Sequence, residues 1–428
     1  MKGARARVQE RPLGQLALLA AAGAHTVRPR RLLTSLVPTL PRPVWLLQAG
    51  GLVNALGSGL VFPFVLVYLH DVRGLTLATA GAVAGTFGFA GIVATPAAGV
   101  LVDRFGAQRV LRVSLVLLAA GYGLFPLIRT PWQAFAFMAL AGLGNAGFWP
   151  SQSALAMGLT PAAARHHSSA VARAVYNLGV GAGAALGGVV LGTGTPRAFA
   201  VLFVLDAATF LFFAALTFFL PGAAAAGHAA GGYRAVARNR VFLALLALNV
   251  VFVTAAYAPF EAGLPLFARD HLHLTPQAIG VVFLANMLGV AVLQLPVAKL
   301  LEGRRRMAAL AAMTAACAAA FLLVAVGGTF PPVLIAAAVL FAAGECVLGP
   351  VVGPLVVGLA PEELRGRYLA LLTSSYAIGF AVGPPLAAVV LAWSPTALWP
   401  LAGAVLLAAG VAGLVLERAL PPAERRTP

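Results

Sequence analysis

Residues 75–128 read LTLATAGAVAGTFGFAGIVATPAAGVLVDRFGAQRVLRVSLVLLAAGYGLFPLI. In this stretch two long apolar runs, 75–101 and 109–128, flank one short charged loop. Each run has about the 20 residues that an α-helix needs to cross a bilayer, and neither alternates with a period of two as a strand would. The stretch therefore predicts a pair of antiparallel membrane-spanning helices.

The same pattern runs through most of the chain. Of its 428 residues, 61% are hydrophobic and 10% are charged, against about 25% charged in an average soluble domain. The mean hydropathy is +0.94. We predict an all-α membrane protein with twelve transmembrane helices, near residues 44–69, 75–101, 109–128, 132–158, 171–192, 197–220, 241–267, 276–300, 307–327, 332–358, 367–392 and 396–416.

The basic residues are distributed unequally between the two predicted sides of the membrane. Of the 29 lysines and arginines, 25 fall on the side of the amino terminus, Arg173 among them, and four fall on the other side. Cytoplasmic loops are enriched in Lys and Arg. We therefore expect a multi-pass protein of a bacterial plasma membrane with both termini in the cytoplasm. The net charge of +17 then reflects topology, and no nucleic-acid partner is implied.

An internal repeat divides the twelve spans into two sets of six. At an offset of 200 residues the chain matches itself at Pro150 and Pro350, Arg165 and Arg365, and Tyr176 and Tyr376. Transporters use parallel repeats of this kind to build a binding site between two pseudo-symmetric halves. The expected organisation is a basic cytoplasmic tail (1–43), a six-helix half (44–220), a cytoplasmic linker (221–240), a second six-helix half (241–418) and a cytoplasmic tail (419–428).

The loop after the second span contains a motif of glycines and charged residues. It comprises Gly99, Asp103, Arg104, Gly106 and Arg109. We expect Gly99 to let helices approach closely, Gly106 to permit the turn, and Asp103 to pair with a cation or a helix N-terminus. This loop resembles the cytoplasmic signature of the major facilitator superfamily, and the overall layout is most similar to its bacterial multidrug-efflux members, the drug:proton antiporters. The resemblance implies the twelve-helix major facilitator fold and a gating role for Asp103.

The matching loop of the second half keeps the charges of the motif but not their order. It contains Glu302 followed by Arg304, Arg305 and Arg306. Glu302 could form a salt bridge or could simply be solvated at the membrane surface.

Small residues recur every four positions in spans five and eleven. Such a stripe lets two helices slide or rock at short distance, although any glycine-rich membrane bundle shows similar packing. Ala184 stands where the antiporter motif of the superfamily has proline. The predicted helix-packing residues are Gly179, Gly183, Gly187, Gly188, Gly379, Gly383 and Pro384.

Three acids fall inside predicted spans, where a carboxylate is expensive and by default functional. We rank Glu345 first as a proton-coupling group, because its repeat partner Asn145 is polar and because Pro350 and Pro150 should break both helices near the same depth. Asp206 is second, with a structural, hydrogen-bonded role as its alternative. Glu261 is third, with a hydrated position at the outer surface as its alternative. The sequence places no arginine within a span core.

Polar and aromatic residues near the middle of the spans predict an amphipathic, sparsely charged cavity that suits a lipophilic or weakly cationic solute. No nucleophile triad, phosphate loop or metal-ligand spacing is present in the sequence, so we expect no enzyme activity, no cofactor and no metal. Cys317 and Cys346 fit small buried residues. The cavity candidates are Asn54, Phe62, Trp149, Gln152, Tyr176, Asn177, Tyr257, Asn286 and Tyr376.

Three functions stay open from the sequence. The first is a proton-coupled exporter that moves a small molecule by alternating access. The second is an uptake or facilitative transporter of the same fold, and the third is a non-transporting membrane scaffold or sensor. The two full repeats and the gating loop favour the first two. The expected partners are a small-molecule substrate, protons and the lipid bilayer, and we expect a monomer.

Overall fold

The computed structural model describes residues 40–161, 164–195, 197–221, 236, 238–327 and 330–427. The chain divides into two units, Met1–Leu40 and Pro41–Pro428. The predicted basic tail 1–43 lies outside the described residues except for its last four, and most of the predicted linker 221–240 lies outside them as well. The fold and the site belong to the second unit.

The described residues form twelve long helical runs, and none of them belongs to a strand. The first half contains α3 (Arg42–Val61), η1 (Phe62–Phe64), α4 (Val65–Val67), η2 (Tyr68–Val72), α5 (Leu77–Phe105), α6 (Ala107–Gly123), η3 (Phe125–Leu127), α7 (Pro131–Leu159), α8 (Arg165–Leu191), α9 (Ala198–Leu216) and η5 (Thr217–Phe219). The second half contains α11 (Arg240–Phe252), η6 (Val253–Tyr257), η7 (Pro259–Gly263), α12 (Leu264–Asp270), α13 (Pro276–Leu300), α14 (Arg306–Val326), α15 (Pro331–Glu345), α16 (Leu348–Leu359), η8 (Glu362–Leu364), α17 (Arg365–Trp393), α18 (Leu398–Leu416), η9 (Glu417–Ala419) and η10 (Pro422–Glu424).

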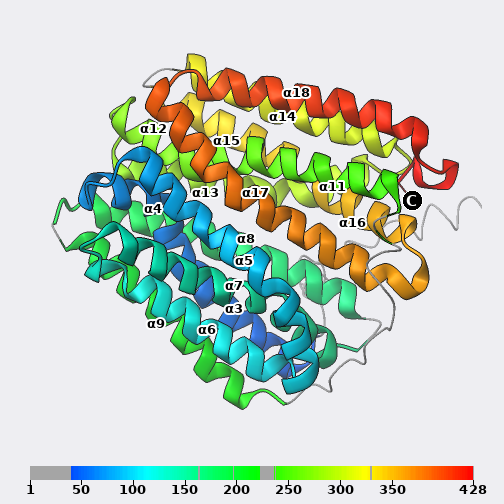
Figure 1. The fold of residues 1–428 in the computed structure, drawn as a ribbon, viewed down its shortest axis with the longest axis horizontal. Coiled ribbons are helices and arrows are strands. Elements are labelled where there is room, and N and C mark those ends of the chain that lie inside the picture. Colours follow the sequence, from blue (N-terminus) through cyan, green and yellow to red (C-terminus); the bar gives the residue numbers. More distant parts are fainter. Residues whose placement is uncertain are drawn as a thin grey trace, which may run out of the picture. The chain divides into compact units, whose positions relative to one another are not determined.

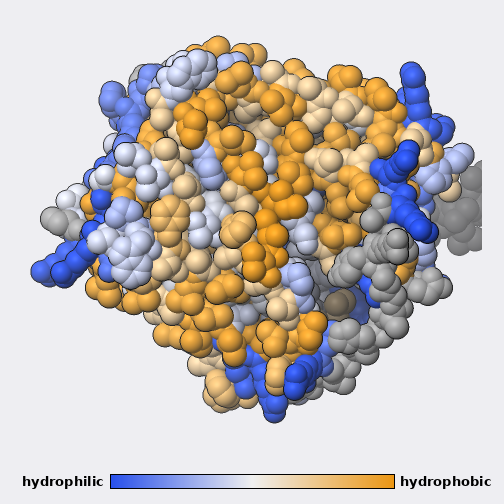
Figure 2. Space-filling model, in the orientation of Figure 1, coloured by the Kyte–Doolittle hydropathy of each residue, from blue (hydrophilic) through white to orange (hydrophobic). Residues whose placement is uncertain are grey.

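Eleven of these runs are long and apolar enough to cross a membrane. The twelfth, α7, has the length but is less apolar, since it carries Gln133, Asn145 and Gln152. Apolar residues also cover most of the face drawn in Figure 2, and hydrophilic residues gather at its margins. The predicted fold class, an all-α membrane protein with two six-helix halves, is confirmed.

Two helix pairs form the main contacts between the halves. Within the first half α3 packs on α8 and α9, and α6 on α7; within the second, α14 packs on α15 and α18. Between the halves α8 packs on α13, and α5 on α17, so these four helices lie at the centre of the bundle (Figure 1). We name the two ends of the bundle after residues found there: the Asp71 end, where the α3 run finishes, and the Arg165 end, where α8 begins.

Three glycines of α5 bring its backbone against α17. A Cβ on Gly88 would lie 2.3 Å from the backbone nitrogen of Ala381, and one on Gly85 would lie 2.5 Å from the carbonyl oxygen of the same residue. A Cβ on Gly81 would lie 2.5 Å from that of Ala388. Only glycine permits such an approach. These contacts lie toward the Asp71 end, and the sequence analysis did not single them out.

The predicted glycine stripe packs mainly inside the halves. A Cβ on Gly183 would lie 2.1 Å from the carbonyl oxygen of Leu56 in α3, whereas one on Gly188 would lie 2.4 Å from that of Pro276 in the other half. The stripe therefore holds α8 and α17 within their own halves at most positions. The remaining members face α3 (Gly179, Gly187), η6 and the residue after it (Gly379, Gly383) and, across the halves, Gly81 of α5 (Pro384).

Proline breaks one of the two helices in which a break was predicted. Pro350 lacks the N–H that would bond to the carbonyl group of Cys346, and its ring crowds that group. The helix is interrupted at this point, with α15 ending at Glu345 and α16 starting at Leu348. The prediction for Pro150 is wrong, because α7 continues through it. There the Ser151 hydroxyl donates to the carbonyl oxygen of Gly147, one turn earlier.

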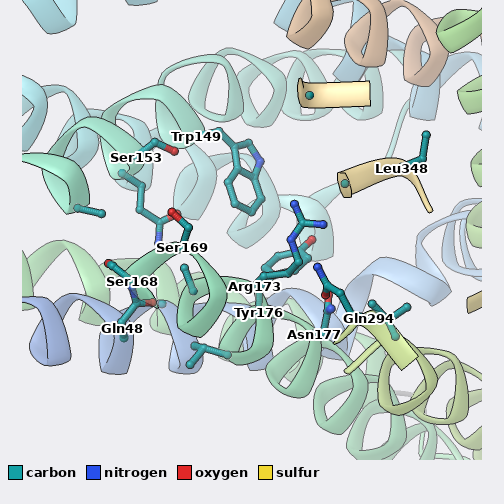
Figure 3. Close-up of a pocket in the computed structure, with 18 of the residues that line it drawn as sticks. Gln48, Trp149, Ser153, Ser168, Ser169, Arg173, Tyr176, Asn177, Gln294 and Leu348 are labelled. Atoms are coloured by element: carbon teal, nitrogen blue, oxygen red, sulfur yellow. The ribbon is translucent and has the colours of Figure 1, made fainter. Parts of the chain in front are cut away.

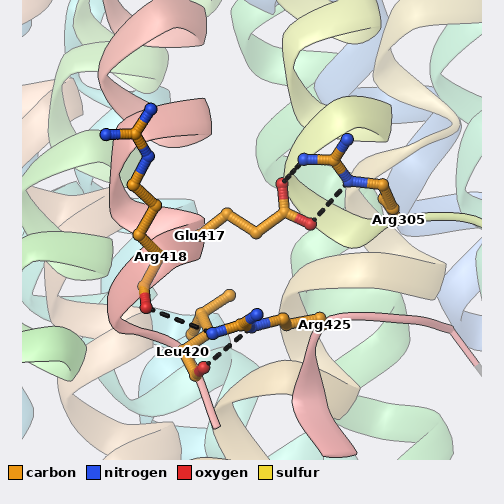
Figure 4. Close-up of polar contacts among 5 residues, drawn as sticks. All are labelled: Arg305, Glu417, Arg418, Leu420 and Arg425. Atoms are coloured by element: carbon orange, nitrogen blue, oxygen red, sulfur yellow. Dashed lines mark hydrogen bonds and ion pairs between the residues drawn. The ribbon is translucent and has the colours of Figure 1, made fainter. Parts of the chain in front are cut away.

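The carboxyl-terminal segment is fixed to the loop between α13 and α14 at the Arg165 end. Glu417 accepts hydrogen bonds from Arg305 Nε at 2.9 Å and Nη2 at 2.6 Å (Figure 4), which raises the pKa of the Arg305 guanidinium. The backbone N–H of Arg306 donates to the carbonyl oxygen of Arg425 at 2.8 Å, and its side chain pairs with Glu424. Glu302 is exposed and forms no ion pair with a described residue, so solvation is the correct alternative for it.

Candidate functional site

A cavity of about 610 Å³ lies between the two halves. Its first-half wall comes from α3, α7 and α8, and its second-half wall from α13, from the α15–α16 break and from α17. The lining extends from Asn54 and Asn177 near mid-helix to Thr160 and Arg165 at the Arg165 end. Figure 3 shows part of this lining, with Trp149, Arg173 and Tyr176 converging on one space.

The structure brings seven of the nine predicted cavity residues into this lining: Asn54, Trp149, Gln152, Tyr176, Asn177, Tyr257 and Tyr376. The other two lie elsewhere. Phe62 is 41% exposed and does not line the cavity. Asn286 is buried and donates from Nδ2 to the carbonyl oxygen of Ala338 at 3.2 Å, so it packs two helices together.

Glu345 is the only acid among the described residues that line the cavity. It ends α15, and the helix break that follows leaves its side chain partly exposed to the cavity. The hydroxyl group of Tyr257, in the π-helical turn η6, donates to its Oε1 at 2.9 Å. π-Helical turns occur often at functional sites. No described residue donates to Oε2, which therefore stays available.

The other two predicted acids lie outside the lining. Asp206 in α9 is 1% exposed, and its Oδ1 finds no hydrogen-bond partner among the described atoms. Glu261 in η7 is partly buried, and its Oε2 also lacks a described partner. Glu261 lies in the π-helical turn that follows that of Tyr257, one turn further toward the Asp71 end.

Arg173 is a cavity residue that the sequence analysis misplaced. It was assigned to the cytoplasmic side, because the predicted span began at residue 171. The helix instead begins at Arg165, and Arg173 lines the cavity two turns deeper, about 12 Å along the axis. The lining residues Arg165, Ser168, Ser169, Ala172, Arg173 and Tyr176 follow the i, i+3, i+4 spacing of one helix face. This polar periodicity could have identified α8 as a cavity wall.

The gating motif has one confirmed element and one correction. Gly106 has φ +85° and separates α5 from α6, which confirms that a glycine permits this turn. Gly99 is exposed, and no described atom lies within 4 Å of a Cβ placed on it. The close helix approach predicted there is therefore wrong for this conformation. Asp103 stands in the last turn of α5 and is partly buried.

An ion pair joins the halves at the opposite end of the bundle. Arg269 in α12 bonds from Nε to Oδ2 of Asp71 in η2, at 2.8 Å. All described lining residues of the cavity lie on the Arg165 side of this pair. The sequence analysis placed both residues in loops and did not predict their contact, because they are about two hundred residues apart.

Comparisons with known proteins agree with this geometry. The curated relatives include the uncharacterized MFS-type transporter YttB of Bacillus subtilis (strain 168), which is 24% identical over 81% of this chain and 87% of its own length. They also include the multidrug efflux pump Tap of Mycolicibacterium fortuitum, which is 28% identical over 80% of this chain and 87% of its own length. A crystal structure of a POT family transporter in complex with a thioalcohol-conjugated peptide has the same fold, with a TM-score of 0.73, 14% identity, and coverage of 89% of this chain and 96% of that one.

These likenesses extend over the two halves and the cavity between them. The sequence profile of the Major Facilitator Superfamily matches residues 48–275 and 246–428. Together the two matches span both six-helix halves and leave only the first 47 residues outside. This chain is a multi-pass membrane protein that belongs to the Major Facilitator Superfamily of transporters.

Proposed function

We propose that this chain is a proton-coupled secondary transporter that exports a small amphipathic solute by alternating access. The observation that carries the proposal is the position of Glu345, a carboxyl group that faces the cavity between the two halves and accepts a hydrogen bond from Tyr257. A carboxyl group there meets water from whichever side the cavity opens to. It can therefore take up a proton on one side and release it on the other.

The surroundings of Glu345 bear on its protonation. A buried charge is expensive unless it is paired, and Tyr257 supplies one donor to the ionised form. Arg173 faces the same cavity from the first half. The titratable or charged groups near enough to interact with Glu345 are Arg173, Tyr176, Tyr257, Glu261, Cys317, Cys346 and Tyr376.

The proposed direction rests on topology and likeness. If the side rich in Lys and Arg is cytoplasmic, both termini and the linker face the cytoplasm. The cavity then communicates with the cytoplasm through the Arg165 end, where a substrate for export would enter. The relative named a multidrug efflux pump supports the same direction. The lining of aromatic and amide side chains suits a lipophilic solute with a small polar group.

The test is transport by inside-out membrane vesicles under an imposed pH gradient. The probes are a screen of lipophilic amines, amino acids and weak acids. We expect the chain to concentrate at least one of them, and we expect Glu345→Gln to abolish uphill transport while downhill exchange of the same solute continues. Glu302→Gln, an exposed acid outside the cavity, is the matched control. Gradient-driven transport by Glu345→Gln at the wild-type rate would favour facilitated transport instead, and transport of no probe at all would refute the proposal.

A further inference from the structure

The two walls of the cavity differ in chemistry. The first-half wall is polar, with Gln48, Gln152, Ser168 and Arg173 among its residues. The second-half wall carries Gln294, Tyr257 and Tyr376 beside its single acid, and its apolar part is formed by α16, with Leu348 and Val352. A solute that fills this space therefore meets a hydrophilic surface on α7 and α8 and an apolar surface on α16.

Arg173 is an unpaired cation within this cavity. No described acid forms an ion pair with it, and Glu345 is not within ion-pair distance. Its guanidinium group reaches across to the second half, where Nη1 lies 3.0 Å from the position that a Cβ on Gly349 would take. A guanidinium offers a planar set of donors that matches a carboxylate. When the cavity closes around a solute and water leaves, this cation requires an anionic partner.

Glu345 makes the opposite demand from the second-half wall. Tyr257 occupies Oε1, and Oε2 has no described donor. A purely anionic solute would be attracted by Arg173 but repelled by ionised Glu345. A purely cationic solute would be attracted by Glu345 but repelled by Arg173. A solute that carries both charges gives each of the two groups a partner of opposite charge. The arrangement therefore disfavours purely anionic and purely cationic solutes.

We propose that the cavity binds an amphipathic zwitterion. Its carboxylate pairs with Arg173, its ammonium group pairs with Glu345, and its apolar body packs on the second-half wall beside Leu348 and Val352. This assignment rests on the proposed function, since the zwitterion is the solute that the alternating cavity carries. It replaces the weakly cationic solute expected from the sequence, which did not place Arg173 in the cavity.

The assignment also accounts for the sign of proton coupling. The ammonium group and a proton compete for the same carboxylate, so binding of either one weakens binding of the other, reciprocally. Such competition is what an exchange of solute for protons needs. Arg173 lies in α8 of the first half, and Glu345 lies at the end of α15 in the second half. A zwitterion that binds both residues therefore bridges the two halves.

The test compares matched probes on the purified full chain in lipid nanodiscs. Naphthylalanine is the zwitterion, its methyl ester is the cation and its N-acetyl derivative is the anion; phenylalanine and its two derivatives repeat the series with a smaller body. Isothermal titration calorimetry gives each Kd. Loss of one charged contact should weaken binding about tenfold, so each zwitterion should bind at least that much more tightly than its derivatives. Equal or tighter binding of a derivative, or no binding of any probe at millimolar concentration, would overturn the proposal.

Two variants assign the charges to residues. Arg173→Gln should weaken zwitterion binding about tenfold and leave the methyl ester bound as well as the zwitterion. Glu345→Gln should also weaken zwitterion binding about tenfold. In this variant the N-acetyl derivative should bind as well as the zwitterion does. Arg240→Gln and Glu302→Gln, which remove equal charges from exposed positions outside the lining, should change no Kd. Unchanged selectivity in Arg173→Gln would refute the assignment.

Proteoliposomes loaded with naphthylalanine separate this inference from the proposed function. Zwitterion-selective binding without response to a pH gradient would reject proton-coupled export and keep the ligand class. Gradient-driven transport of the methyl ester, unaffected by Arg173→Gln, would reject the ligand class and keep the export.

Discussion

Arg269 of the second half bonds to Asp71 of the first half, from Nε to Oδ2 at 2.8 Å, and so ties the two halves at the end of the bundle opposite the cavity mouth. The side chains are 36% and 18% exposed, which places the pair between a surface contact and a buried one. Exposed ion pairs contribute about 0–1 kcal/mol. That amount is small against the stability of the fold, but it can shift an equilibrium between two access states severalfold.

Asp71→Asn should therefore favour the state that is open at the Asp71 end. Ala388 lies in the α5–α17 contact at that end and is 1% exposed. In a background with Cys317 and Cys346 replaced by alanine, we expect Ala388→Cys to react about two- to fivefold faster with an impermeant maleimide when Asp71→Asn is present. Glu302→Gln, an exposed acid at the Arg165 end with no described ion pair, is the control. Equal labelling rates in the two backgrounds would show that the pair does not hold the halves together.

Gly88→Ala should disfavour the same closed contact by a steric route. The new Cβ would lie 2.3 Å from the backbone nitrogen of Ala381, and backbone cannot move aside as a side-chain tip can. Overpacking of this kind costs typically about 1–3 kcal/mol. We expect faster maleimide labelling of Ala388→Cys and a lower melting temperature. Gly91→Ala on the same helix is the matched control, because no described atom lies within 4 Å of its Cβ. Identical behaviour of the two variants would contradict the packing argument.

Asp103→Asn tests the gating role implied by the family resemblance. The residue stands in the last turn of α5, next to the glycine turn at Gly106, and the substitution is nearly isosteric. We expect normal folding, judged by gel filtration and melting temperature, together with a strong loss of turnover in vesicles, since the balance between the two access states changes. A wild-type transport rate would show that the resemblance does not extend to this function.

Glu417→Gln should loosen the carboxyl-terminal segment. Glu417 is 5% exposed, and its carboxylate accepts two hydrogen bonds from Arg305. The variant replaces this carboxylate by a neutral amide and so removes the ion pair. The raised pKa of Arg305 keeps this cation charged until strong alkali, so on the alkaline side the contribution of the pair to stability is lost as pH rises through that raised value. At neutral pH both partners are ionised and the contribution is present. We expect faster trypsin cleavage at residues 304–306 in the variant at neutral pH. Glu302→Gln should cleave at the wild-type rate, and equal rates in all three proteins would argue against the contact.

The sequence predicted the fold more completely than the cavity, and the reasons are physical. Span length and charge asymmetry depend on the bilayer, which acts on each helix separately, so twelve spans follow from local composition. Whether a residue lines the cavity depends on which way its helix is rotated. Phe62 and Asn286 look like cavity residues by type, yet one is exposed and the other joins two helices.

Arg173 shows the converse error. Its charge placed it at the cytoplasmic edge of the predicted span 171–192, whereas in the structure it lies two turns inside α8 and faces the open cavity. The local pattern of hydrophobicity and charge also does not predict contacts between distant segments. The pair of Asp71 with Arg269 and the approach of Gly88 to Ala381 each depend on how the halves dock, which no local period encodes.

Asp206 offers the sharpest contrast with Glu345, because both are acids near the middle of a predicted span, and the sequence ranked Glu345 first and Asp206 second. Asp206 is 1% exposed and lies outside the lining, whereas Glu345 faces the cavity. Proton exchange once per cycle requires access to water, and in this conformation Asp206 has almost none. We therefore expect Asp206→Asn, which mimics the neutral acid, to retain gradient-driven transport in inside-out vesicles, and Glu345→Gln to lose it. Melting temperatures of the two variants distinguish unfolding from uncoupling. If Asp206→Asn folds normally but is uncoupled, the proton pathway must include α9 of the first half. Glu345 would then not be the only residue that carries the proton.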